Sequence, residues 1–205
     1  MADDHFGMHC VRDAYTSRAQ EYISLLGSVQ DMDPLDQTLI SGWAQGINGP
    51  ILDAGSGPGH WTDFLRSRGC EIQGLDAVQA FVDSASQRFP ATSFSLGDLR
   101  SIPLSDDYFS GLLAWYSIIH TDPRHCGALF GEFARVVKPG GELLIGAFCG
   151  QQGEEFDHAV VRAYYWSVQG LRSALESAGF SVLETHTRTT RRHRPHVAVL
   201  ARRND

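Results

Sequence analysis

A glycine-rich segment at residues 53–59 is the feature that most constrains how this chain folds. It reads DAGSGPG, closes a short apolar run that begins at Ile51, and precedes residues 61–67, whose apolar side chains recur at helical spacing. Glycine permits a tight turn with positive φ, and without a Cβ it lets a ligand lie against the backbone. Amide groups at such a turn and at the start of a helix can bind a carboxylate. The segment therefore predicts a strand–turn–helix unit that binds a ligand, with a turn that merely requires glycine as the alternative.

Strand-like and helix-like segments alternate from Pro50 to the end of the chain. Strands are expected at residues 51–54, 70–75, 92–96, 111–116 and 142–148, and helices at residues 61–67, 78–89, 125–137 and 171–178. This alternation, with short connections, implies βαβ units and a parallel sheet covered by helices. Residues 180–189 and 196–201 then read as an antiparallel hairpin at the sheet edge. The expected fold class is α/β, with a doubly wound, mostly parallel sheet and an antiparallel C-terminal hairpin.

Residues 1–48 are helix-like but have no place in this alternation. We expect them to form an N-terminal helical cap within the same domain as residues 49–205. A chain of 205 residues suits one domain with a sizeable core and a small addition of this kind.

Composition and charge point away from nucleic acids and membranes. The chain has 42% hydrophobic and 20% charged residues, as soluble globular proteins do, and a formal net charge of −7. Nucleic acids and anionic membranes attract basic proteins, so neither is expected as the main partner. No apolar run reaches the roughly 18 residues of a membrane span. The four cysteines are widely separated and form no CxxC pair, which indicates reduced thiols in the cytoplasm, no metal site and no disulfide framework.

One basic run, at residues 186–194, stands out in this acidic chain. Its arginines partly alternate with threonines inside the expected C-terminal hairpin, which favours a solvated sheet edge whose charge discourages strand addition. A nucleic-acid patch and a place for an anionic ligand are the alternatives.

Two acidic residues end the strands that follow the glycine segment. Asp76, about 20 residues after the glycines, is placed to accept hydrogen bonds from both hydroxyls of a ribose, or else to cap the next helix. Asp98 ends the third expected strand; it suits an adenine amino group, with Leu99 packed on the ring, or a plain turn. A dinucleotide-binding G-x-G-x-x-G turn would need glycine where His60 stands, which disfavours NAD.

Taken in order, these motifs resemble the class I S-adenosylmethionine-dependent methyltransferases of the small-molecule type. The matching text lies at residues 51–59, 74–76, 97–99, 103–109 and 133–141, in the order and spacing of that family. The resemblance implies a seven-stranded Rossmann-like sheet with five parallel strands and a final antiparallel pair. The glycine segment would then face the methionine part of the cofactor. One departure is Ser110, where the family usually has an acid, and we expect only a local change of capping there.

The resemblance also implies an enzyme. It would move the methyl group of S-adenosylmethionine to an oxygen or nitrogen of a small-molecule acceptor and leave S-adenosylhomocysteine. Its partner would be that acceptor, with no nucleic acid and no membrane, and the protein would be a monomer or a homodimer. A methyltransferase for a macromolecule such as tRNA and a non-catalytic S-adenosylmethionine-binding protein are the alternatives. The residues expected to bind the cofactor are Tyr15, Tyr22, Asp53, Ala54, Gly55, Ser56, Gly57, Gly59, Trp61, Asp76, Ala77, Asp98, Leu99, Trp115 and Tyr116.

His120 is the best candidate for a catalytic base. It follows the fourth expected strand, beside the expected position of the methyl group, and an unperturbed imidazole has a pKa near 6.5. Methyl transfer rests mainly on positioning the acceptor, and a base adds roughly 10²–10⁴-fold where the acceptor must lose a proton. A histidine that supports the loop and the cofactor is the alternative. His158 is a second, weaker candidate, and the Asn-Pro-Pro-Tyr motif of amine methylation is missing after the fourth strand.

Residues 150–166 form a long connection after the fifth expected strand. Long connections often serve as lids or binding loops, and the aromatic side chains of Tyr164 and Trp166 suit a ring-bearing acceptor. Packing under the loop is the alternative for both. Tyr15 and Tyr22 in the N-terminal segment are open to the same two interpretations, contact with the ligands or ordinary packing.

Overall fold

The computed structural model describes residues 2–190 and 194–205, without the side chains of residues 2–9 and 26. Its centre is a seven-stranded sheet of order β3-β2-β1-β4-β5-β9-β8. The strands are β1 (Ile51–Ala54), β2 (Ile72–Asp76), β3 (Ser93–Leu96), β4 (Phe109–Trp115), β5 (Val137–Phe148), β8 (Phe180–Arg188) and β9 (His196–Arg203). β1 to β5 run parallel, whereas β9 runs antiparallel between β5 and β8. The predicted α/β class with an antiparallel C-terminal hairpin is confirmed.

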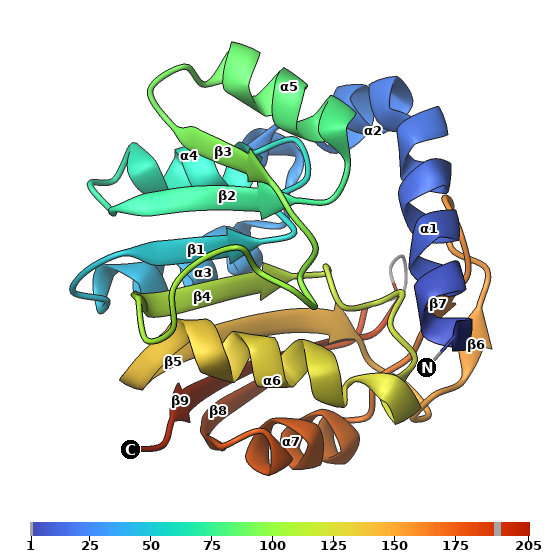
Figure 1. Ribbon diagram of the computed structural model, residues 1–205, viewed down its shortest axis with the longest axis vertical. Coiled ribbons are helices and arrows are strands. Elements are labelled where there is room, and N and C mark those ends of the chain that lie inside the picture. Colours follow the sequence, from blue (N-terminus) through green and yellow to red (C-terminus); the bar gives the residue numbers. More distant parts are fainter. Residues whose placement is uncertain (1, 191–193) are drawn as a thin grey trace.

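Helices cover both faces of the sheet (Figure 1). One face carries α3 (Pro34–Gln45) and α4 (His60–Arg66), and the other carries α6 (Gly127–Val136) and α7 (Val168–Ser177). Successive residues of a strand point to opposite faces, so Leu113 of β4 packs on the α3–α4 side and Leu112 on the α6–α7 side. Both faces are thus buried, which explains why β4 reads as a continuous apolar run.

The segment before β1 forms helices with different roles. They are α1 (Ala2–Ser17), α2 (Ala19–Leu26), the 3₁₀ turn η1 (Val29–Asp31) and α3, and α5 (Gln79–Arg88) follows β2. α3 belongs to the helical layer, because Ile40 and Trp43 are buried in the core beside the sheet. Ala19 of α2 instead joins an apolar cluster with Phe81 of α5. The arrowheads of β2 and β4 point toward α1 (Figure 1). α1 therefore lies across the carboxyl ends of these strands.

The long connection after β5 forms a two-stranded ribbon. Its strands, β6 (Glu155–Phe156) and β7 (Ala163–Tyr164), pair antiparallel. A second 3₁₀ turn, η2 (Pro123–His125), precedes α6.

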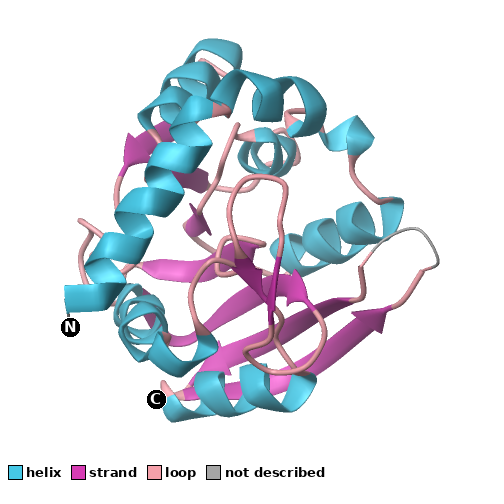
Figure 2. Ribbon diagram, turned by 90° about the vertical axis from the view of Figure 1, so that its right-hand side faces the viewer, coloured by secondary structure: helices cyan, strands magenta, loops and turns pink. Residues whose placement is uncertain are grey.

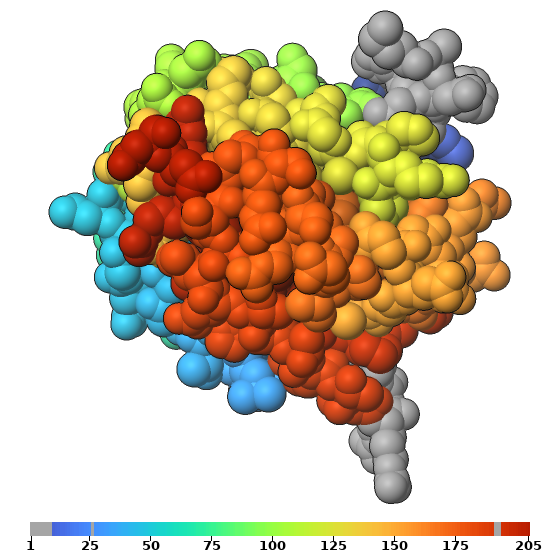
Figure 3. Space-filling view, turned by 90° about the horizontal axis from the view of Figure 1, so that it is seen from below, coloured from blue at the N-terminus to red at the C-terminus, as the bar shows by residue number. Residues whose placement is uncertain are grey.

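Figure 2 looks onto the side where α1 and the connecting loops gather over the sheet. On the face seen in Figure 3, the α7–β8 segment lies between the C-terminal residues and the ribbon segment. Within the described residues, no helix is both long and apolar enough to cross a membrane.

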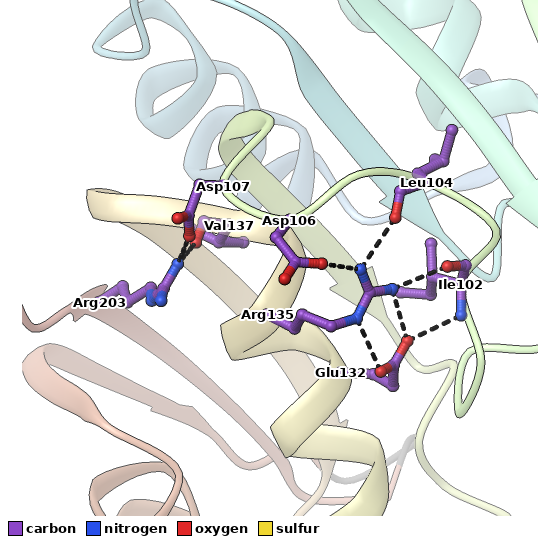
Figure 4. Close-up of polar contacts among 8 residues, drawn as sticks. All are labelled: Ile102, Leu104, Asp106, Asp107, Glu132, Arg135, Val137 and Arg203. Atoms are coloured by element: carbon purple, nitrogen blue, oxygen red, sulfur yellow. Dashed lines mark hydrogen bonds and ion pairs between the residues drawn. The ribbon is translucent and has the colours of Figure 1, made fainter.

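A polar cluster around Arg135 fixes the loop that leads into β4 (Figure 4). Arg135 on α6 donates to the carbonyl oxygens of Ile102 and Leu104 at 2.8 and 2.9 Å. It also pairs with Asp106 at 2.5 Å and with Glu132 at 2.8 Å. Glu132 in turn accepts from the amide of Ile102 at 2.9 Å. A second set of contacts beside this cluster joins Arg203, Asp107 and Val137.

Candidate functional site

A cavity of about 320 Å³ lies at the carboxyl ends of the parallel strands, where doubly wound sheets bind ligands. Residues expected at the site that line this cavity are Tyr15, Tyr22, Asp53, Gly55, Ser56, Gly57, Trp61, Asp76, Ala77, Asp98, Leu99, Trp115, Tyr116 and His120. Ala54 and Gly59 lie outside its lining. Ala54 is fully buried within β1. Gly59 packs against the ring of Phe94, because a Cβ added to Gly59 would lie only 2.6 Å from that ring.

The glycine turn uses backbone conformations that favour glycine. φ is +84° at Gly55, +52° at Gly57 and +81° at Gly59. A Cβ on Gly55 would lie 2.3 Å from the Cβ of Ser117, so this position has no room for a side chain. A Cβ on Gly57 would meet no atom within 4 Å. Gly57 therefore exposes its backbone to open space, and a ligand in the cavity can approach it closely.

Asp76 ties the glycine turn to the end of β2. One carboxylate oxygen accepts from the amide of Gly57 at 2.8 Å, and the other accepts from the amide of Val78 at 2.9 Å. Burial raises the pKa of Asp76 to about 6, although these amide donors oppose the shift. The N-cap residue of α5 is Val78, which has no side-chain capping hydrogen bond, so Asp76 fixes the turn before α5 without capping it. The same carboxylate lines the cavity.

Asp53 lies at the floor of the cavity. Its carboxylate is buried and accepts from the hydroxyl of Thr62 on α4 at 2.6 Å. Burial raises the pKa of Asp53 to about 7, and the hydrogen bond from Thr62 opposes that shift. The group therefore changes charge close to neutral pH.

Asp98 lies in a tight turn after β3. It accepts from the backbone amide of Arg100 at 2.9 Å and pairs with the guanidinium of the same residue at 2.8 Å. The amide of Ser101 donates to the carbonyl oxygen of Asp98 at 3.0 Å. The turn interpretation is thus supported, and Asp98 also lines the cavity next to Leu99.

His120 is held by two hydrogen bonds whose directions follow from chemistry. Its Nδ1 lies 2.8 Å from the carbonyl oxygen of Arg162, which can only accept, so Nδ1 carries the proton. Burial lowers the pKa of His120 to about 4, so the ring is neutral and Nε2 keeps its lone pair. The hydroxyl of Tyr15, 2.9 Å away, therefore donates to Nε2. This bond joins α1 to the loop after β4.

His158, the second candidate base, lies against His120 in the cavity wall. The two ring centroids are 5.3 Å apart in an edge-to-face arrangement, and burial lowers the pKa of His158 as well.

Tyr15 packs edge-on against Tyr22 and Phe81, with ring centroids 5.5 and 5.9 Å away. Both tyrosines therefore combine aromatic packing with a place in the cavity wall.

The end of β4 turns sharply into the cavity. Tyr116 has a φ of +57°, which is unfavourable for a large side chain, and strained residues of this kind gather at functional sites. Its hydroxyl lies 2.6 Å from Nδ1 of His196, and its ring packs on Phe148 with centroids 4.8 Å apart. The conformation is thus held by β9 and β5, and it places Tyr116 beside Trp115 in the lining.

Asp36 is a cavity residue that sequence reasoning missed. It lies on α3, is buried, and pairs with Arg188 of β8 at 2.7 Å. The available signal was helical spacing, because Asp36 lies four and seven residues before Ile40 and Trp43 and shares their inward side. An acid on the apolar side of a helix indicates a buried partner or ligand. Other unanticipated lining residues include Met32, His60, Phe81 and Phe148.

Several other sequence expectations lie away from the cavity. Trp166 is fully buried and packs on Phe130, so packing is the interpretation that its position supports. Tyr164 lies on β7, outside the cavity lining, and its amide donates to the carbonyl oxygen of Ile119. Ser110 is buried inside β4 and caps no helix, so the expected change of capping is wrong. The basic run begins in β8, and residues 191–193 lie outside the described part of the chain.

Comparisons with known sequences point to methyltransferases. A family model described as a methyltransferase domain matches residues 51–141. A malonyl-[acyl-carrier protein] O-methyltransferase of Salmonella typhimurium is 34% identical over 102 residues, which are 48% of this chain and 39% of that protein. The chain thus spans well under half the length of this relative.

Comparisons with solved structures show the same fold. A 1,6-didemethyltoxoflavin-N1-methyltransferase of Burkholderia thailandensis, solved with 1,6-didemethyltoxoflavin and S-adenosylhomocysteine, has a TM-score of 0.79 at 18% identity, covering 98% of this chain and 91% of that chain. The [4+2]-cyclase SpnF has a TM-score of 0.78 at 19% identity, covering 95% of this chain and 96% of that chain. Residues 51–141 thus match a methyltransferase domain, and the chain has the fold of the methyltransferase solved with S-adenosylhomocysteine.

Proposed function

We propose that this protein is an S-adenosylmethionine-dependent methyltransferase that moves a methyl group to an oxygen or nitrogen of a small molecule. The observation that carries the proposal is that the open backbone of Gly57 and the carboxylate of Asp76 lie side by side in one cavity at the strand ends. The names of the two methyltransferases compared above, one an O-methyltransferase and one an N1-methyltransferase, agree with this class of reaction.

The charge of the lining supports this cofactor. S-adenosylmethionine carries a sulfonium, an ammonium and a carboxylate, so its net charge is positive. Four carboxylate side chains line the cavity, those of Asp36, Asp53, Asp76 and Asp98, together with Arg12. Asp36 and Asp98 are paired with Arg188 and Arg100, so the argument rests on Asp53 and Asp76. Aromatic rings, which attract cations over their faces, form much of the remaining wall. Such a lining suits a cationic ligand better than a pyrophosphate.

Under this proposal, the cofactor extends from the glycine turn toward β2 and β3. Asp76 accepts the ribose hydroxyls with the lone pairs that remain after its bonds to Gly57 and Val78. Asp98 and Leu99 hold the adenine ring. The methionine part lies against the glycine turn, with Asp53 beneath it.

The chain's own residues then act on the acceptor. S-adenosylmethionine supplies the methyl group from its sulfonium. The acceptor takes the place of the Tyr15 hydroxyl at Nε2 of His120, and this nitrogen receives the proton that the acceptor loses. The carbonyl oxygen of Arg162 holds the other ring nitrogen and stabilises the imidazolium that forms. A weak base suffices for a hydroxyl acceptor, because its O–H becomes strongly acidic as the oxygen gains the methyl group.

Turnover with methyl-labelled S-adenosylmethionine tests the reaction. The full chain is incubated with labelled cofactor and a fractionated extract of small molecules, and heat-denatured protein is the control. We expect label in an acceptor and an equal amount of S-adenosylhomocysteine. Because a [4+2]-cyclase shares this fold, saturable cofactor binding without any label transfer would overturn the transfer reaction and leave a binding protein.

We further propose that the protein works in the cytoplasm, as a monomer or homodimer, with a small molecule and no nucleic acid as partner. Its four cysteines, Cys10, Cys70, Cys126 and Cys149, are free thiols, which is the usual state in a reducing compartment. Residues 1–48 would serve as a cap within the same domain as residues 49–205, with α1 and α2 over the ligand. Light scattering in solution measures the oligomeric state.

A further inference from the structure

A second hollow, here called the arginine groove, borders α4. Its volume is about 410 Å³, and the residues that define it are Ser28, Gln30, His60, Arg68 and Arg88. The groove lies between the segment that links α2 to α3, the end of α4 and the end of α5. Polar atoms make up more of its surface than apolar atoms do, in contrast to the cavity described above.

Two guanidinium groups reach the groove without an acidic partner. Arg88 donates to the carbonyl oxygen of Gly27 at 2.5 Å, and Arg68 donates to the carbonyl oxygen of Phe64 at 3.2 Å while lying over that ring. Within the described residues, neither guanidinium forms an ion pair with a carboxylate. A guanidinium has five N–H donors, so both retain donors for a ligand.

The acidic residue in the lining of the groove is already engaged. Asp63 contributes a carboxylate to the lining, and this carboxylate accepts from Arg66 at 3.2 Å and from the hydroxyl of Thr92 at 3.1 Å. The groove therefore keeps an excess of positive charge.

His60 gives an independent indication of a ligand. Both of its ring nitrogens are buried, and neither has a hydrogen-bond partner. Burial lowers the pKa of His60 to about 4, with the charge of Arg88 as a smaller cause, so the ring is neutral. A neutral imidazole carries one N–H donor and one acceptor, and buried polar groups ordinarily have partners.

We propose that the arginine groove binds the phosphate group of a small metabolite, with Arg68 and Arg88 pairing with its oxygens and the ring N–H of His60 as a further donor. Guanidinium groups match phosphate oxygens in geometry and charge. A tetrahedral anion fills only a small part of 410 Å³, so the groove has room for the organic part of the ligand.

The arginine groove is separate from the cavity at the strand ends but shares one lining residue with it. His60 lines both the arginine groove and the cavity, next to Trp61 and after the glycine turn. A ligand that moves the ring of His60 therefore changes the wall of the cofactor cavity. The proposal does not rest on the methyltransferase function, because phosphate binding is measured without cofactor.

Calorimetric titration of the full chain with inorganic phosphate, at an ionic strength held constant with sodium chloride, tests this site. We expect one saturable site, and a saturable shift of the His60 ring resonance in a carbon–proton correlation spectrum assigned with His60→Gln. Arg68→Gln and Arg88→Gln should each weaken the affinity at least about tenfold, the effect of losing a charged hydrogen bond. Arg172→Gln on α7, on the opposite side of the molecule, is the matched control and should leave the affinity unchanged (Figure 1).

Two further arms make the test decisive. Arg88→Lys keeps the positive charge, so it should retain more affinity for phosphate than Arg88→Gln does. Melting curves of both variants first establish that each is folded. A glycerol phosphate titration separates the two sources of the phosphate group, since tighter binding of the ester indicates a metabolite and equal binding indicates the free ion. Non-saturable heat, or affinities unchanged in both glutamine variants, would overturn the proposal.

Discussion

At the residue scale, Asp76 joins three parts of the molecule through one carboxylate. Its oxygens accept from Gly57 and Val78, so it fixes the glycine turn, the end of β2 and the approach to α5 together. The sequence predicts an acid at this strand end, because its spacing after the glycines is visible. The bond to Gly57 could not be predicted, since it depends on β1 and β2 lying side by side.

Asp76→Ala should weaken the binding of S-adenosylhomocysteine by about 30- to 150-fold. The variant loses hydrogen bonds to a charged group, worth about 2–3 kcal/mol, and leaves the Gly57 amide without its acceptor. Trp61 and Trp115 line the cavity, so quenching of tryptophan fluorescence reports the affinity. Asp76→Asn keeps one accepting oxygen and should lose less. An Asp76→Ala protein with the affinity of the wild type would contradict the ribose role.

Asp53 makes stability depend on pH near neutrality. Its folded-state pKa of about 7 lies above the unfolded value of 3.8, so the folded protein holds this proton more tightly. The stabilisation is complete below the unfolded pKa and is lost as pH rises through the folded pKa. As the pH rises from 5 to 8, ionisation of Asp53 should therefore lower the free energy of unfolding by roughly 2–3 kcal/mol.

Asp53→Asn is the variant that isolates this effect. The amide oxygen still accepts from Thr62 but does not ionise, so the variant should lose less stability than the wild type between pH 5 and pH 8. Urea unfolding at several pH values measures the difference. Parallel pH profiles for the two proteins would show that Asp53 does not titrate in this range.

At the element scale, local pattern and tertiary pairing disagree at the start of β5. The sequence indicates a helix over residues 125–137 and a strand only from 142, whereas α6 ends at Val136 and β5 begins at Val137. Val137 pairs with Phe109 of β4, a contact between distant segments that no local pattern contains. For the same reason, the sequence did not place Asp36 of α3 or His196 of β9 at or beside the cavity.

Arg135→Ala should lower the free energy of unfolding by about 1–3 kcal/mol. The substitution leaves the carbonyl oxygens of Ile102 and Leu104 without their donor and frees the loop before β4 (Figure 4). Arg172→Ala removes an exposed ion pair with Glu176 and should change stability by less than about 0.5 kcal/mol. The urea midpoints of the two variants measure their losses of stability. Equal losses in Arg135→Ala and Arg172→Ala would show that the cluster around Arg135 does not stabilise the loop before β4.

Tyr15→Phe should loosen α1 without unfolding the protein. The variant keeps the aromatic packing on Tyr22 and Phe81 but loses the hydrogen bond to His120, worth about 0.5–1.5 kcal/mol. Local opening of α1 should therefore rise about two- to tenfold, as faster amide hydrogen exchange there. Tyr108→Phe, at an exposed tyrosine, is the control. Unchanged exchange in α1 would mean that this bond does not hold the helix.

At the scale of the whole molecule, the fold was predictable and the distribution of charge was not. Alternating strands and helices admit few topologies, because parallel connections are short and right-handed, so the sheet could be derived from residues 50–205. Carboxylates gather around one cavity, and two arginines that have no carboxylate partner among the described residues lie on one groove, although the sequence shows only a net charge of −7. Such clusters combine residues from helices and strands far apart in the chain, so they become visible only in the folded molecule.

Calorimetric titration of the full chain with S-adenosylhomocysteine tests the central claim most directly. The cavity at the strand ends should bind one molecule per chain, with a Kd on the order of 1–100 μM. Adenosine alone should bind more weakly, because it lacks the part that faces the glycine turn. The absence of binding heat up to millimolar S-adenosylhomocysteine, in a protein that melts cooperatively, would contradict the account.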